Sequence, residues 1–155
     1  MSELIVMCGL PGSGKSFYSR QYVENHPEFT VVSTDKIRGE LFGDESDQRD
    51  GWLVFMRAYS DLTTILKSGG SAIFDATNLK KSDREKILKY FRKVCPDAKL
   101  KLVFMTTPVP ICVERDKNRD RVVGEDVILN MKHKLDWPND AEGWDDILYN
   151  FVVLE

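Results

Sequence analysis

Residues 9–16 read Gly-Leu-Pro-Gly-Ser-Gly-Lys-Ser, which matches the pattern G-x-x-x-x-G-K-[ST] at every fixed position. The apolar run Leu4–Cys8 before it is typical of a buried parallel strand, and Ser16–Asn25 behind it can form a helix. A glycine-rich turn between a strand and a helix directs backbone N–H groups and a helix dipole toward one point. The motif therefore predicts a polyphosphate-binding loop, and its context disfavours the alternative of an ordinary glycine-rich turn.

The fixed positions of this loop have separate roles in the prediction. Gly9, Gly12 and Gly14 would let the backbone approach the ligand closely, because a Cβ atom there would restrict the chain or block the ligand. Lys15 would bridge the β- and γ-phosphates, and the Ser16 hydroxyl would bind Mg²⁺. We therefore expect ATP or another nucleoside triphosphate, with Mg²⁺. The residues expected to contact the nucleotide here are Gly9, Pro11, Gly12, Ser13, Gly14, Lys15, Ser16 and Phe17.

Length and composition set limits on the class of protein. A chain of 155 residues with 42% apolar and 30% charged residues predicts one globular domain over residues 1–155. No apolar run approaches the roughly 18 residues of a membrane span, so we expect no membrane partner. The N-terminal Met-Ser-Glu leads directly into a strand without a basic region, so we expect no signal peptide and a cytoplasmic location. Three scattered cysteines predict reduced thiols rather than a disulfide framework or a zinc site. The net charge of −3 disfavours a wide basic surface for long nucleic acids but allows a local basic cleft.

Strand-like apolar runs alternate with helical patterns along the chain. Strands are expected at Leu4–Cys8, Phe29–Ser33, Ala72–Phe74, Leu100–Met105 and Ile147–Leu154. Helices are expected at 16–25, 35–42, about 49–67 and from an S-x-x-E capping box at 82–85 to before Pro96, with two basic helical stretches before the last strand. A polar break is expected at 43–47. The alternation predicts a parallel sheet with helices on both faces.

Ligands of such sheets bind beyond the carboxyl ends of the strands, which makes the residues that follow each strand candidates for the site. Asp75 ends the third strand and would bind Mg²⁺, directly or through water, or anchor an arginine; the alternative is a turn or N-cap aspartate. Residues 106–108, after the fourth strand, are expected to form a plain exit turn.

The residues after the second strand suggest an acceptor site. Asp35 is placed to orient and deprotonate an acceptor hydroxyl, although either Asp35 or Thr34 could instead cap the following helix. Arg38 lies one turn later on the same helical face and would hold an anionic acceptor. The alternative for Arg38 is an exposed ion pair with Asp35, worth only a few tenths of a kcal/mol.

Basic residues gather in two clusters. Lys80, Lys81, Arg84 and Lys86 form the first, for which a solvated face is the favoured interpretation. The second consists of Arg115, Lys117, Arg119 and Arg121. Arg115 and Arg119 are four residues apart, so they lie on the same face of a helix. Arginines on a closing lid can stabilise the negative charge of a phosphoryl group during its transfer, and this spacing suits that role. The interleaved Glu114, Asp116 and Asp120 support the alternative of a salt-bridged surface helix.

Together these residues make nearly the whole chain resemble the kinase module of polynucleotide 5′-hydroxyl kinases and the related small P-loop kinases. Besides the loop and the arginines, the resemblance rests on Ser33–Arg38, on Phe74–Leu79 with its D-x-T-N turn, on Val127 and Ile128, and on Trp137–Asp145. It implies an α/β P-loop NTPase fold of the adenylate-kinase-like kind. The implied sheet has five parallel strands in the order 2-3-1-4-5, with a helical lid at about residues 113–124.

The resemblance also implies an activity, the transfer of the γ-phosphate to the 5′-hydroxyl of a DNA or RNA end. It implies Asp35 as the general base, with Lys15 and Arg119 as further catalytic residues and Ser16 and Asp75 as metal ligands. Arg115 and Arg119 would contact the nucleotide, and the acceptor side would consist of Thr34, Asp35, Arg38, Thr77 and Asn78.

Other functions fit the same motifs. One is a P-loop kinase that acts on a small metabolite or a tRNA-linked acceptor, and another is an ATP-hydrolysing nucleotide-binding switch. The sequence contains no guanine-reading N-K-x-D motif, which disfavours a GTPase. Asp35 favours a hydroxyl acceptor over a switch, because a switch has no need of a carboxylate at that place.

Overall fold

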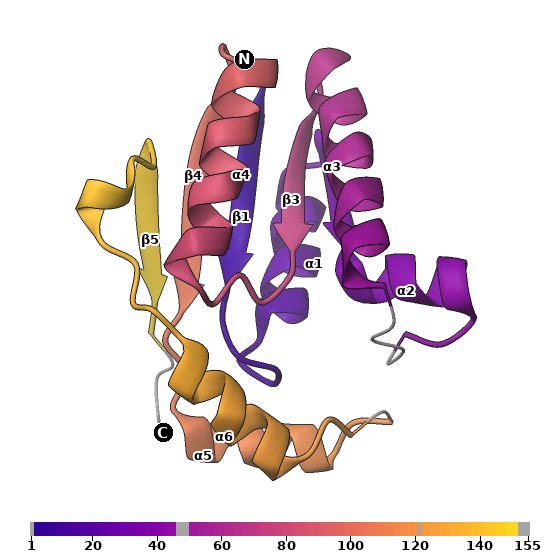
Figure 1. Ribbon diagram of the computed structural model, residues 1–155, viewed down its shortest axis with the longest axis vertical. Coiled ribbons are helices and arrows are strands. Elements are labelled where there is room, and N and C mark those ends of the chain that lie inside the picture. The colour runs from indigo at the N-terminus through magenta and orange to yellow at the C-terminus, as the bar shows by residue number, and fades with distance from the viewer. Residues whose placement is uncertain (1, 46–49, 121, 152–155) are drawn as a thin grey trace.

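The computed structural model describes residues 2–45, 50–120 and 122–151 (Figure 1). Within these residues a single parallel sheet runs in the order β2-β3-β1-β4-β5. Its strands are β1 (Glu3–Cys8), β2 (Phe29–Ser33), β3 (Ser71–Asp75), β4 (Lys99–Met105) and β5 (Asp146–Asn150). The predicted fold class and strand order are confirmed.

Helices cover both faces of this sheet (Figure 1). One face packs against α1 (Lys15–Asn25), and the other packs against α3 (Gly51–Lys67) and α4 (Lys81–Val94). Beyond the carboxyl ends of the strands lie α2 (Thr34–Phe42), α5 (Val109–Lys117) and α6 (Glu125–Lys134). The short 3₁₀-helix η1 (Asp140–Glu142) precedes β5. Among the described residues, no helix combines the length and apolar character needed to cross a membrane.

Side chains of the central strands alternate between the two faces. Leu4 and Val6 of β1 are fully buried in the cluster formed with α3 and α4, whereas Ile5 and Met7 are buried in the cluster beside α1. The period of two follows from the strand pleat, and burial on both faces explains why β1 is a continuous apolar run. Both faces of the sheet are therefore covered by helices, and the carboxyl ends of its strands remain for the predicted site.

The start of α4 differs from the prediction. The capping box at residues 82–85 does not form, because the helix begins earlier, at Lys81, and Ser82 lies inside its first turn. The backbone N–H of Lys81 instead donates to Oδ2 of Asp136, at 2.9 Å, so the cap comes from a residue far along the chain. A capping box does exist at η1, where Asn139 and Glu142 exchange side-chain and backbone hydrogen bonds.

Smaller differences occur at other element ends. The N-cap of α2 is Ser33, whose Oγ accepts from the N–H of Lys36, so neither Thr34 nor Asp35 has this role. Parts of three predicted segments lie outside the described residues: 46–47 of the polar break, 49 of the following helix and 152–154 of the last strand. The cysteines at positions 8, 95 and 112 are free and buried, as expected.

Candidate functional site

The predicted phosphate-binding loop connects β1 to α1 at the carboxyl edge of the sheet (Figure 1). Gly14 has a left-handed backbone, with φ of +99°, and α1 begins immediately after it, at Lys15. Gly12 is left-handed too, with φ of +80°. Two positive φ values within three residues fold the chain so that successive N–H groups can converge, which is the geometry of an anion-binding nest.

Packing within the protein explains two of the loop glycines. A Cβ atom on Gly12 would lie 2.5 Å from the backbone oxygen of Cys112 in α5. A Cβ atom on Gly9 would lie 2.7 Å from Oγ of Ser13 and 3.0 Å from Cβ of Met105. The expectation that these glycines serve ligand approach is therefore incomplete, because the loop needs them to fit against α5 and β4.

Thr107, in the turn after β4, anchors the loop from the neighbouring strand. Its Oγ1 donates to the backbone oxygen of Ser13 at 2.7 Å, and the bond is buried. The prediction of a plain exit turn at this place was wrong. The one sequence signal was position, since β4 pairs with β1 and its carboxyl end must lie beside the loop. Among the described residues, Oγ of Ser13 has no hydrogen-bond partner, although the side chain is buried.

Lys15 lies within the loop that precedes it. Its Nζ donates to the backbone oxygen of Leu10 at 3.0 Å. Burial lowers the pKa of Lys15, while the negative charges of Asp75 and Asp35 oppose that shift. Carboxylates from β3 and α2 therefore act on the same ammonium group, which brings predicted metal and acceptor residues to the same rim of the sheet.

Ser16 and Asp75 form the predicted metal site. The Ser16 hydroxyl donates to Oδ2 of Asp75 at 2.8 Å, although 59 positions separate them in the chain. A hydroxyl and a carboxylate that meet beside a phosphate loop suit Mg²⁺, which is commonly held by one or two such oxygens together with nucleotide phosphates and water. No group of three or more histidine, cysteine, aspartate or glutamate residues with metal-site geometry occurs in the described part of the chain.

Helix α2 carries Asp35 and Arg38, which were predicted to contact the acceptor. Nη1 of Arg38 lies 3.2 Å from Oδ1 of Asp35, so the i,i+3 ion pair that was considered as an alternative does form. The Arg38 side chain is only 12% exposed, against 47% for Asp35. Its Nε is buried, with no hydrogen-bond partner in the described residues. The pair therefore joins a mostly buried guanidinium group to a half-exposed carboxylate. The Nε–H group of Arg38 remains available to donate a hydrogen bond.

The turn after β3 is attached to the end of β1. The N–H of Gly9 donates to the oxygen of Thr77 at 3.0 Å, and Nδ2 of Asn78 donates to the oxygen of Met7 at 2.8 Å. Asn78 is buried and has a left-handed backbone, with φ of +46°. Asn78 was predicted to bind the acceptor substrate, but its side-chain N–H group is already bonded to the protein. Its Oδ1 is buried and has no hydrogen-bond partner among the described residues.

The arginines of the predicted lid differ in position. Nη1 of Arg115, on α5, lies 3.4 Å from the oxygen of Gly12 and so borders the loop. Nη1 of Arg119 lies 3.8 Å from Oδ1 of Asp116. Asp116 is buried and accepts the N–H groups of residues 123 and 124 at 2.9 and 2.8 Å, so of the alternative of a salt-bridged surface helix the ion pair is present but the surface position is not. Residue 121, which belongs to the predicted lid and basic cluster, lies outside the described residues.

Two more predicted positions have clear locations. Phe17, expected near the nucleotide, lies in the first turn of α1 and is 59% exposed. In the first basic cluster, Lys80, Lys81 and Lys86 are exposed as expected, but Arg84 is fully buried, so the solvated-face interpretation was wrong for it.

Comparison with known families places the chain. A family model described as an AAA domain matches residues 4–138. The chain belongs to this family. The match covers the phosphate-binding loop, the acceptor-side helix, the β3 turn and both helices α5 and α6.

The proteins to which this chain is similar include kinases and a ribonucleoprotein. An L-seryl-tRNA(Sec) kinase of Methanococcus maripaludis is 27% identical over 146 residues, which are 92% of this chain and 56% of that protein. Heterogeneous nuclear ribonucleoprotein U-like protein 2 of Mus musculus is 26% identical over 169 residues, covering 99% of this chain and 22% of that protein. The chain thus spans about half, or less, of these curated relatives. The crystal structure of a fungal RNA kinase superimposes with a TM-score of 0.71 at 14% identity, over 96% of this chain and 38% of that one, and shows the shared fold.

Proposed function

We propose that this protein is an ATP-dependent P-loop kinase that transfers the γ-phosphate to a hydroxyl acceptor, preferably the 5′-hydroxyl of a DNA or RNA end. The observation that carries the proposal is the hydrogen bond from Ser16, at the end of the phosphate-binding loop, to Asp75 at the end of β3, with Asp35 following the neighbouring strand β2. Phosphoryl transfer needs a cation for the phosphates, oxygens for a metal ion and a base for the acceptor. These groups belong to different elements that meet at the same edge of the sheet.

In this proposal the loop holds the nucleotide. Its N–H groups and Lys15 would bind the phosphates. The Ser13 hydroxyl, which has no partner in the described residues, could bond to the ligand, and Lys15 could exchange its bond to Leu10 for one to a phosphate. Ser16 and Asp75 would hold Mg²⁺, which supplies charge neutralisation of the phosphates when it is bound. The Ser16 hydroxyl, which donates its hydrogen to Asp75, keeps oxygen lone pairs that could bind the metal ion.

The acceptor side then supplies the proton chemistry. The half-exposed carboxylate of Asp35 would accept the proton of the acceptor hydroxyl as its oxygen forms a bond to the γ-phosphorus. The bond from that phosphorus to the β–γ bridging oxygen breaks, and ADP leaves. Arg38, with an unused Nε, would bind a phosphate of the acceptor, and Arg115 and Arg119 would stabilise charge on the transferring group.

The nature of the acceptor is the finer part of the proposal. A buried arginine beside the base suits an acceptor with its own phosphate, as a polynucleotide end has. The likeness to a seryl-tRNA kinase favours a second candidate, a hydroxyl on a tRNA-linked group or a small metabolite. Both candidates need Asp35, whereas a nucleotide-binding switch does not.

The first experiment measures label transfer from γ-labelled ATP with Mg²⁺ to a short 5′-hydroxyl oligonucleotide, with Asp35→Asn as the matched control. We expect transfer by the wild type and a loss of about 10²–10⁴-fold in the variant, the usual contribution of a general base. The variant should still bind ATP, because Asp35 lies outside the loop.

Other results separate the candidates. ATP binding without transfer to the oligonucleotide would move the acceptor to a seryl-tRNA or a small hydroxyl compound, tested next in the same assay. ATP hydrolysis that no acceptor stimulates would favour a nucleotide-binding switch. Full activity of Asp35→Asn would contradict the assignment of the base.

A further inference from the structure

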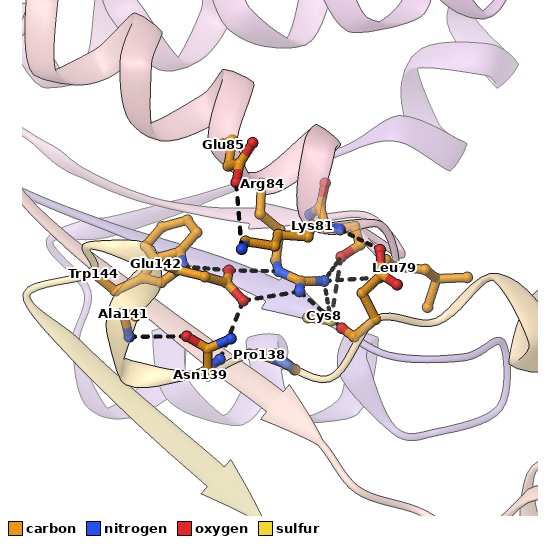
Figure 2. Close-up of polar contacts among 12 residues, drawn as sticks. Cys8, Leu79, Lys81, Arg84, Glu85, Pro138, Asn139, Ala141, Glu142 and Trp144 are labelled. Carbon is orange, nitrogen blue, oxygen red and sulfur yellow. Dashed lines mark hydrogen bonds and ion pairs between the residues drawn. The ribbon is translucent and has the colours of Figure 1, made fainter.

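Arg84 is the largest side chain that is fully buried in the described residues, and it carries a charge. It projects from the first turn of α4 into the space between Glu142 and Leu79, as Figure 2 shows. Its partner is Glu142 of η1, with Nε to Oε1 at 2.9 Å and Nη2 to Oε2 at 3.0 Å, and neither side chain is exposed. This is a bidentate ion pair, the most directional kind of contact between these groups.

The same guanidinium contacts segments that surround the predicted site. Nη1 donates to the oxygens of Asn78 and Leu79, at 3.0 and 2.8 Å, and lies 3.8 Å from Sγ of Cys8 at the end of β1. Nη2 also donates to the oxygen of Asp136, at 2.8 Å, in the connection that follows α6. The N–H of Asp136 in turn donates to the oxygen of Leu79 at 2.9 Å.

Glu142 is held as firmly as Arg84. Its Oε1 accepts from Nε1 of Trp144 at 3.2 Å, and its Oε2 accepts from the N–H of Asn139 at 3.1 Å. Burial alone would raise the pKa of Glu142, but the hydrogen bonds from Arg84 and Trp144 hold it below its usual value. The carboxylate is therefore charged at neutral pH and fixed in one orientation.

A second arginine of α4 offers an internal comparison. Arg92 pairs with Asp145 at 3.0 Å and donates to the oxygen of Gly143 at 2.9 Å, so it joins the same helix to the same connection before β5. The Arg92 and Asp145 side chains are 39% and 35% exposed, and the hydrogen bonds of Arg92 to Asp145 and Gly143 do not involve the β3 turn. Arg92 thus attaches the connection to α4 without contact with the predicted site.

We propose that Arg84 and Glu142 are a positioning pair, which holds the turn at residues 77–79 against the end of β1 and locks it to the connection after α6. This inference rests on the proposed kinase function. Through the bond from Gly9 to Thr77, the placement of that turn is also the placement of the phosphate loop relative to Asp75. A shift of about 1 Å in such groups can cost about 10²-fold in rate.

Stability alone does not account for this pair. Replacing a buried ion pair by apolar side chains of similar volume is often neutral or stabilising, whereas removal of one partner leaves an unpaired buried charge. The distinguishing property of the pair is therefore direction, since several hydrogen bonds specify a single arrangement of three chain segments. This difference supplies the design of the test.

The test uses the double variant Arg84→Met with Glu142→Met, and Arg92→Met as the matched control. Amide hydrogen exchange is measured by mass spectrometry at Gly9, Lys81 and Asp136, whose N–H groups bond to Thr77, Asp136 and Leu79. We expect exchange to rise about tenfold or more at these sites in the double variant and to remain at wild-type rates elsewhere in the sheet. Arg92→Met should leave these amides unchanged.

Kinetics provide the second readout. With the acceptor that the wild type uses, we expect kcat of the double variant to fall about 10²-fold, with KM for ATP changed less than threefold. Arg84→Lys keeps the charge but has one nitrogen, so it cannot bond to the turn, Asp136 and Glu142 together. It should show the same local exchange with an intermediate kcat, and it replaces the double variant if that protein fails to fold.

Several outcomes would overturn the inference. Wild-type exchange at Gly9 and Asp136, a rise of exchange throughout the sheet, or an unchanged kcat despite local exchange would each do so. An equal loss of kcat in Arg92→Met would show that docking of the connection, and not placement of the turn, matters. The exchange measurement needs no acceptor, so a failure of the proposed function would appear separately, as a lack of transfer by the wild type.

Discussion

The two halves of the proposed site, one for the nucleotide and one for the acceptor, are built differently. The nucleotide half, residues 9–16 with Asp75 and Thr107, is fixed by backbone atoms: Gly12 fits against the Cys112 oxygen, and Thr107 bonds to the Ser13 oxygen. The acceptor half, Asp35 and Arg38 on α2, is defined by side chains, one of them half exposed.

From this contrast we expect substitutions to be tolerated more readily in the proposed acceptor half than in the proposed nucleotide half. Main-chain packing tolerates few substitutions, because a clash with backbone cannot be relieved by a change of side-chain rotamer. Side chains on one helical face can be exchanged singly. Within the AAA-domain chain we therefore expect the nucleotide half to act alike with every acceptor and the acceptor half to decide which hydroxyl is used.

Among the four substitutions that test this comparison, Lys15→Ala should have the largest effect. Loss of the ammonium group removes a cation from the developing phosphate charge, and we expect kcat to fall by about 10²–10³-fold. The loss should be equal for every acceptor tested by label transfer, because Lys15 belongs to the nucleotide half. A loss confined to one acceptor would break the division into halves. Circular dichroism provides the control for folding.

Arg38→Ala should have the next largest effect, and a selective one. A charge-assisted hydrogen bond is worth about 1.5–3 kcal/mol, so KM for a phosphorylated acceptor should rise about 10- to 150-fold. KM for ATP should change little. Steady-state kinetics with an oligonucleotide and with an uncharged hydroxyl acceptor checks this, since the uncharged compound should be insensitive to the substitution. An equal rise for ATP would place Arg38 in the nucleotide half.

Gly12→Ala tests whether backbone packing fixes the nucleotide half. Its positive φ and the close Cys112 oxygen should make the added methyl group cost about 1–3 kcal/mol of folding free energy. Urea denaturation measures this cost. Gly43→Ala is the matched control, because Gly43 also has a positive φ, of +74°, but its Cβ would meet nothing within 4 Å. Equal losses would mean that backbone strain, not contact with α5, governs position 12.

Thr107→Val should give the smallest effect. The variant keeps the shape of the side chain but removes the bond to Ser13, at a cost of about 0.5–1.5 kcal/mol. We expect ATP to bind about 2- to 12-fold more weakly, as measured by calorimetry. Thr106→Val is the control, because its hydroxyl bonds to Asn150 and not to the loop. If both variants bind ATP alike, Thr107 does not order the loop.

Local patterns predicted much of this molecule, and contacts distant in sequence account for what they missed. The motif at residues 9–16, the apolar runs and the alternation of strands and helices are read within short windows, and the structure agrees with them.

The residues that sequence patterns misplaced have partners far along the chain or across a loop. Arg84 was grouped with exposed lysines, yet its partner Glu142 is 58 positions away. Asp116 had the pattern of a surface charge, yet its carboxylate accepts hydrogen bonds from the backbone of residues 123 and 124. Thr107 followed a strand without any motif. A charged or hydroxyl side chain has the same local pattern in both environments, so only the assembled sheet shows which one it occupies.

The order of the strands has a consequence for how the protein could be altered. Within the described residues, β2 is an edge strand that pairs only with β3, and α2 follows it directly. The strands that lead into the phosphate loop and Asp75, β1 and β3, each pair on both sides. An edge strand can be replaced without breaking the hydrogen bonds between the central strands of the sheet. Under the proposed roles, we therefore expect that exchanging residues 29–42 would change the acceptor preference, while β1, β3 and the phosphate-binding loop stay as they are.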